Sequence, residues 1–175
     1  MSLFLLLACL PDDPPGTDTR PLLSDSVDTG EADDTAAQDG LIGEWLSEGS
    51  DVSELFAGPP FEYVSITARF KDDGSYRVVG STDGGDSYTF SGTYVTDEST
   101  SPGGITLAQT QPSASTAEGI FLVESDPVEG DKLTYEIVQV DPDYGYSPPT
   151  PEGGFGSTSG PNMEDGINVQ VYRRQ

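Results

Sequence analysis

The side chains that most often carry chemistry are scarce in this sequence. None of the 175 residues is histidine, which removes the usual neutral-pH base, the commonest metal ligand and any serine–histidine triad. Cys9 is the single cysteine, so neither an internal disulfide nor a cysteine-clustered metal site can form. The sequence therefore predicts a protein that is not an enzyme and has no catalytic residue, no cofactor and no metal site.

Two short motifs have the letters of catalytic signatures without their context. Asp28-Thr29-Gly30 spells the aspartic-protease triplet, but those enzymes need two such carboxylates facing each other in a packed core. The segment GSTSG has Thr158 where a nucleophile elbow has serine. The aspartates at 72–73, 83–86 and 141–143 lack calcium-loop spacing, so we interpret them as solvated turn residues.

The charge of the chain is strongly unbalanced. There are 31 acidic residues against 7 basic ones, for a formal net charge of −24. Nucleic-acid affinity comes mainly from Lys and Arg that neutralise phosphates, so this balance excludes a nucleic-acid partner. It equally disfavours a polybasic contact with anionic lipid. A cationic partner, or solubility alone, remains compatible with it.

The first nine residues end an apolar run at the cysteine. Leu6-Leu7-Ala8-Cys9 resembles the lipobox of bacterial lipoproteins, in which the cysteine becomes the lipidated first residue of the mature protein. The run is too short to span a bilayer, which needs about 20 apolar residues. The resemblance implies that residues 1–9 are a signal segment and that Cys9 anchors the protein in a membrane. Leu10 and Pro11 follow the cysteine in place of aspartate, which by the same resemblance points to the outer membrane.

Residues 10–40 have the composition of a tether. They contain nine acidic residues and one arginine among Pro, Gly, Ser and Thr. Such a segment cannot bury enough apolar surface to offset the entropy of ordering it, so we expect a disordered linker. Its root-mean-square span would be about 30 Å, from about 5–6 Å times the square root of its length.

The pattern changes at Leu41 to short runs of period-two alternation separated by turn signals, and no long amphipathic helix is indicated. We expect an all-β domain over residues 41–175, an eight-stranded antiparallel up-and-down barrel, because closure removes exposed strand edges. One helical turn is expected within 50–57. The expected strands cover 41–46, 61–71, 75–81, 87–95, 104–109, 119–125, 132–140 and 167–174.

Several motifs in this region follow one another in a known order. Gly43-x-Trp45, then Phe70 with Asp73-Gly74-Ser75-Tyr76, then Ser91-Gly92-Thr93-Tyr94 resemble the pattern of lipocalin-like domains. The resemblance spans residues 41–140, with the last strand from Gly166. It implies a barrel with Trp45 near one closed end, and it carries over no catalytic residue. The long connection at 141–165 departs from the pattern.

An eight-stranded barrel either fills its interior with side chains or holds one small ligand. Alternation places Phe70, Val169 and Val171, among other apolar residues, on the inside. In the first hypothesis the barrel binds a small apolar or amphipathic ligand. Its contacts would be tyrosines of the interior, with two more from the long connection: Tyr76, Tyr94, Tyr135, Tyr144 and Tyr146. In the alternative, the barrel is filled and serves as a structural or protein-interaction module of the envelope.

Overall fold

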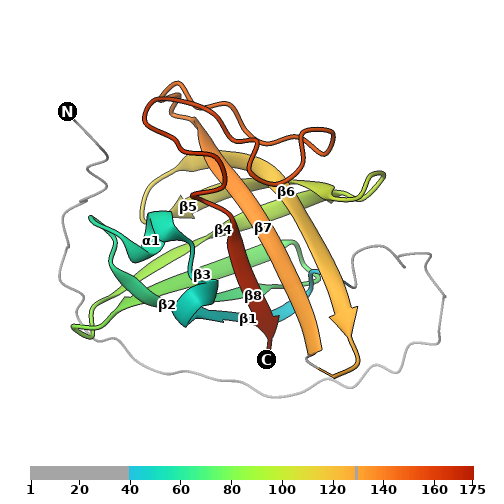
Figure 1. Ribbon diagram of the computed structural model, residues 1–175, viewed down its shortest axis with the longest axis horizontal. Helices are drawn as coiled ribbons and strands as arrows, with labels where there is room; N and C mark the ends of the chain where they lie inside the picture. The colour runs from blue at the N-terminus through green and yellow to red at the C-terminus, as the bar shows by residue number, and fades with distance from the viewer. Residues whose placement is uncertain (1–39, 129) are drawn as a thin grey trace, which may run out of the picture. The chain divides into compact units, whose positions relative to one another are not determined.

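The computed structural model describes residues 40–128 and 130–175, and it confirms the expected barrel. Eight strands close into one antiparallel sheet in which each pairs with its neighbours in sequence and β1 pairs with β8 (Figure 1). The strands are β1 (Gly43–Glu48), β2 (Tyr63–Phe70), β3 (Ser75–Thr82), β4 (Ser87–Asp97), β5 (Gly103–Gln111), β6 (Ser115–Asp126), β7 (Gly130–Asp141) and β8 (Gln170–Arg174).

The two ends of the barrel differ in what lies across them. At one end, here the Trp45 end, the chain enters β1 and leaves β8, and short connections join β2 to β3 and β4 to β5. At the other, the α1 end, the 3₁₀ turn η1 (Gly49–Asp51) and the helix α1 (Glu54–Ala57) connect β1 to β2. The connection 142–169 between β7 and β8 also starts and finishes at the α1 end (Figure 1).

Local sequence explains the tight turns and the curvature of the sheet. Gly74 has a φ of +74° in the β2–β3 hairpin, where the Asp73 carboxylate accepts a hydrogen bond from the Ser75 amide at 2.8 Å. Gly92 lies at a β-bulge between β4 and β5. A Cβ atom on Gly92 would overlap the Ala108 carbonyl oxygen, so glycine is what permits this close approach.

The inside of the barrel holds one aromatic and aliphatic core. Most of the side chains that alternation places inside are found there, but Val169 and Val171 are not. Leu133 and Tyr135 of β7 face inward and pair with Tyr172 and Gln170 of β8. The inward residues of β8 are therefore Gln170 and Tyr172, and the expected assignment of the two valines was wrong. A strand with valines on one face and a buried glutamine on the other gives no compositional sign of which face is inside.

Arg174 closes the Trp45 end. Its guanidinium lies 4.3 Å from the centre of the Trp45 ring and donates hydrogen bonds to the Ile42 and Gly40 carbonyl oxygens and to the Asp131 carboxylate. The Trp45 indole N–H donates to the Leu41 carbonyl oxygen at 2.8 Å. Trp45 is buried, as expected for a residue near a closed end.

The strand boundaries move by a few residues from those expected, and β8 begins at Gln170 because the chain from 167 to 169 forms turns rather than a ladder. The helical turn expected within 50–57 is present as η1 followed by α1. Cys9 and the expected signal and linker segments before residue 40 lie outside the described residues. Within those residues, no helix has the length and apolar character to cross a membrane.

Candidate functional site

The structure brings three of the five predicted ligand-binding tyrosines together inside the barrel. The rings of Tyr76, Tyr94 and Tyr135 all contact Phe70, with centroid distances of 6.4, 5.2 and 6.4 Å. Tyr172 continues the group at 6.3 Å from Tyr135. The four tyrosines and Phe70 are all buried, so these rings form part of the packed interior of the barrel.

Burial determines the acid–base behaviour of these tyrosines. Desolvation raises the pKa of Tyr76 from the ordinary value of 10.0 to about 12. The pKa values of Tyr135 and Tyr172 are raised in the same direction and by more. The pKa of Tyr94 is raised first by burial and then by nearby carboxylates, including Asp72. All four hydroxyls are therefore neutral near pH 7, and the Tyr94 hydroxyl donates to the Lys71 carbonyl oxygen at 2.8 Å.

Two hollows lie on the outer surface rather than among these rings. The first, about 250 Å³, lies at the α1 end between the segment 50–54 and the segment 164–171. The second, about 280 Å³, lies between the outer face of β4–β6 and the prolines of the segment 148–151. Small-molecule sites usually have volumes of about 300–1,000 Å³, so both hollows are below the size of a typical ligand pocket.

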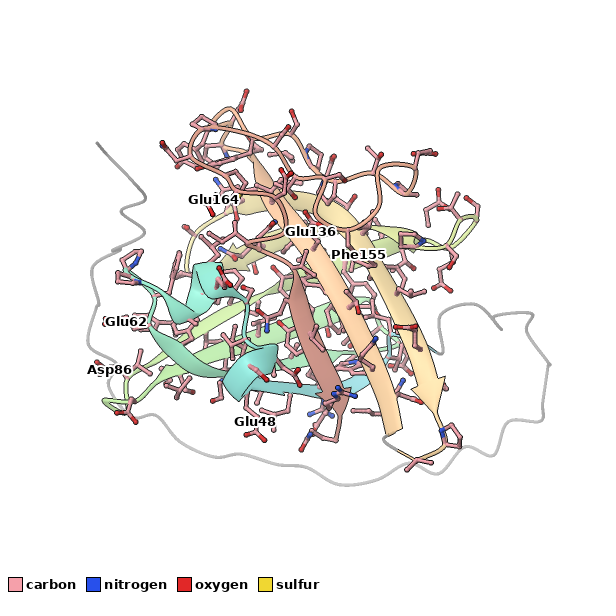
Figure 2. The ribbon with its side chains drawn as sticks, viewed as in Figure 1. Glu48, Glu62, Asp86, Glu136, Phe155 and Glu164 are labelled. Carbon is pink, nitrogen blue, oxygen red and sulfur yellow. The ribbon has the colours of Figure 1, made fainter. Side chains whose placement is uncertain are left out.

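A buried carboxylate fixes the connection 142–169 to the outside of the barrel. Glu136 has 0% exposure and faces outward on β7, since its neighbours Tyr135 and Ile137 pack into the interior (Figure 2). Its carboxylate accepts hydrogen bonds from the Gly156 amide at 2.6 Å and from the Thr158 amide at 3.0 Å and hydroxyl at 2.5 Å. Asn168 in turn donates to the Thr158 hydroxyl oxygen at 3.2 Å.

Two apolar residues near Glu136 are buried although they face outward, and the connection carries the other two predicted tyrosines. Ile120 and Val138 face outward from β6 and β7 and are nonetheless buried. Tyr144 is 51% exposed and Tyr146 is half-buried. Because this connection binds the outward-facing Glu136, the structure does not place Tyr144 and Tyr146 with the interior tyrosines.

Gln170 attaches η1 and α1 to the α1 end of the barrel. Its side-chain amide donates to the Ser47 hydroxyl and to the Asp51 carbonyl oxygen, and its carbonyl oxygen accepts from the Ser53 amide at 3.0 Å. The Leu55 amide donates to the Ile167 carbonyl oxygen at 3.0 Å, which joins α1 to the connection 142–169. The two segments that flank the first hollow are therefore held in place.

A second aromatic group lies at this end. Phe56 and Phe61 are in edge contact at 5.4 Å, and Tyr63 packs against both of them and against Tyr88. The Tyr63 ring lies directly over Gly80, where a Cβ atom would be 2.6 Å from the ring. Tyr88 is 46% exposed, so part of this aromatic group faces solvent.

The charges of the described residues are divided between the two ends. Every Lys and Arg among them lies near the Trp45 end, either in the β2–β3 hairpin or within the last three residues of a strand at that end. They are Arg69, Lys71, Arg77, Lys132, Arg173 and Arg174. The α1 end carries mostly carboxylates, including Glu48, Glu54, Glu62, Asp83, Asp86, Glu164 and Asp165, and Arg173 reaches it to pair with Asp51 of η1. Figure 2 shows Glu48, Glu62, Asp86 and Glu164 around the side of the barrel at which α1 lies.

Sequence reasoning missed Glu136, Gln170 and the division of charge between the ends. Glu136 alternates with inward residues, a position at which a strand usually places a solvated side chain. Only the path of the connection 142–169 buries it. The division of charge had a readable signal, because the basic residues after residue 40 all fall near one set of expected turns.

The described residues contain no group of three or more acidic or cysteine side chains placed to hold a metal ion. Comparison of the chain with protein-family models, with curated proteins and with solved structures found no match. The site is therefore interpreted from its own geometry.

Proposed function

We propose that this barrel is a non-catalytic protein-interaction module of the bacterial cell envelope. The observation that carries the proposal is the contact of Phe70 with Tyr76, Tyr94 and Tyr135 inside the barrel. Interior aromatic rings in mutual contact are what a filled barrel requires. The interior then provides stability, and the outer surface and the two ends remain to contact a partner.

The competing hypothesis is a carrier of a small apolar or amphipathic molecule, and thermal unfolding separates the two. Ligand at 100 times its Kd adds about 2.7 kcal/mol to the free energy of unfolding, which raises Tm measurably. We expect no concentration-dependent rise in Tm with a fatty acid, a quinone or an isoprenoid alcohol. A rise in Tm with any of these compounds would overturn the proposed interaction module in favour of a ligand carrier.

A cavity variant provides the positive control for this assay. Leu133 is fully buried, so Leu133→Ala is expected to leave an apolar cavity of the kind that accepts benzene in other proteins. Benzene should raise the Tm of this variant and leave the unmodified protein unchanged. The control shows that an absent shift reflects a filled interior rather than an insensitive assay.

We also propose that lipid on Cys9 tethers the module to the membrane, with the outer membrane as its location. This rests on the likeness of Leu6-Leu7-Ala8-Cys9 to a lipobox and on the acidic composition of residues 10–40. Stable anchoring takes about two acyl chains, which a diacylated cysteine would supply. We expect Cys9→Ser to move the protein from the membrane fraction to the soluble fraction, and unchanged partitioning would refute the tether.

A further inference from the structure

The α1 end combines an excess of negative charge with an aromatic surface. Among the described residues Arg173 reaches this end and pairs with Asp51, whereas Glu54, Glu164 and Asp165 form no ion pair, and Tyr88 is 46% exposed beside Tyr63. The hollow of about 250 Å³ opens at this end. We propose that the α1 end binds a basic segment of a partner protein and that one Lys or Arg side chain of the partner enters the hollow.

The lining of the hollow suits a long basic side chain. Ile167, Val169 and Val171 supply an apolar surface against which the methylene stem of Lys or Arg can pack. Glu54, Glu164 and Asp165 supply carboxylates for the charged head, and none of these three forms an ion pair within the described residues. The volume fits one side chain better than a whole small-molecule ligand, for which about 300 Å³ is the lower limit.

A polar group in the hollow lacks a partner. Ser53 lines the hollow and is 5% exposed, and its hydroxyl oxygen has no hydrogen-bond partner among the described residues. A buried hydroxyl without a partner costs free energy, which an ammonium or guanidinium donor would recover. The neighbouring pair Asp51–Arg173, with 3.5 Å between carboxylate oxygen and guanidinium Nε, shows that a guanidinium is accommodated beside η1.

The exposed aromatic ring adds a second contact for the same segment. A guanidinium over a tyrosine face is attracted by the ring, by about 0.5–1 kcal/mol at an exposed site. Tyr88, which is 46% exposed at the α1 end, is an aromatic side chain available for such a contact. A second basic residue of the segment would therefore find an aromatic contact at the same end of the barrel.

This inference rests on the proposed function, because a module needs a binding surface, and its test is independent of the hydrophobe assay. The full chain is titrated into a fluorescein-labelled peptide of alternating arginine and serine, with a glutamate–serine peptide and spermidine as comparisons. Glu54→Gln/Glu164→Gln removes two exposed carboxylates at the α1 end. Asp72→Asn/Glu98→Gln removes two at the Trp45 end and is the matched control, since both double variants change the net charge equally.

We expect the first double variant to weaken binding of the arginine peptide by about tenfold and the control to change it by less than about twofold, because exposed ion pairs contribute individually small energies. Amide shifts in NMR spectra of the full chain should fall on 50–54 and 164–167. If both double variants weakened peptide binding equally, or if the amide shifts were confined to residues 10–39, the binding would be attraction by net charge alone. Either result would overturn the proposed site. Spermidine binding as tightly as the peptide would also overturn it, in favour of a small polycation.

Discussion

Glu136 and Thr158, 22 residues apart in the chain, form the contact that fixes the connection 142–169 to the barrel, through both the amide and the hydroxyl of the threonine. The carboxylate is fully buried, and the Gly156 amide completes its set of donors. A carboxylate that accepts three hydrogen bonds from one segment joins that segment firmly to β7.

Glu136→Gln should therefore loosen the connection without unfolding the barrel. The glutamine amide turns one acceptor into a donor that faces the Gly156 or Thr158 amide. We expect a loss of about 2 kcal/mol in the free energy of unfolding, since hydrogen bonds to charged groups contribute about 1.5–3 kcal/mol. Urea denaturation measures the loss, and limited proteolysis should cut the variant first within 142–169. Glu118→Gln on the neighbouring strand is exposed and should change neither result; identical behaviour of the two variants would contradict the role of Glu136.

Gly80→Ala should disturb the aromatic group at the α1 end. The added Cβ atom would lie 2.6 Å from the Tyr63 ring, so the ring must move away from β3. Overpacking of this kind typically costs about 1–3 kcal/mol. We expect a lower Tm and a changed near-ultraviolet circular dichroism spectrum. In Gly84→Ala, from the following hairpin, the nearest atom would be 3.7 Å away, so this variant should keep both properties. A Tm for Gly80→Ala equal to that of Gly84→Ala would show that Tyr63 does not pack as described.

The buried tyrosines predict a loss of stability at alkaline pH. Burial raises the pKa of Tyr63 and of Tyr76 from the ordinary 10.0 to about 12. A group whose pKa is raised on folding contributes stability that is complete below the unfolded pKa and is lost as pH rises through the folded pKa. Stability should therefore be maintained up to about pH 10 and fall between about pH 10 and 12.

Tyrosine variants test that origin. Tyr76→Phe removes one titrating hydroxyl from the interior and should make stability fall less steeply over this range of pH. Tyr144→Phe, at a residue that is 51% exposed, should leave the pH dependence as it is. The measurement is urea denaturation at a series of pH values, with tyrosinate absorbance as the record of ionisation. An unchanged slope in Tyr76→Phe would assign the alkaline transition to other groups.

The fold was predictable because the pattern of this sequence is local. Alternation along β2 predicted Val64, Ile66, Ala68 and Phe70 on one face, and the last three are buried together. Val64 is 47% exposed because the register shifts between Tyr63 and Ser65. The glycine of the β2–β3 hairpin marks where the chain reverses. Closure followed from eight such strands joined mostly by tight turns. Strand β8 was assigned with its faces exchanged, because pairing with Leu133 and Tyr135 of β7 determines which of its residues are inside.

The site was less predictable because it depends on segments that lack a repeating pattern. The grouping of Tyr76, Tyr94 and Tyr135 followed from alternation, whereas their contacts with Phe70 depend on ring packing across the barrel. Burial of Glu136 depends on where the connection 142–169 passes. The hollow at the α1 end forms between segments more than 100 residues apart in the chain, and no pattern in either segment predicts that they meet.

Gly40 and Gln175 both lie beside Trp45, since Arg174 binds the Gly40 carbonyl oxygen and the Gln175 amide binds that of Glu44. Immobilising the protein on a sensor chip through a residue placed next to Gln175 would therefore leave the α1 end open to the analyte. Coupling through Glu54 or Glu164 would instead block the α1 end. A capture assay could therefore detect or miss the same partner, depending only on the residue used for attachment.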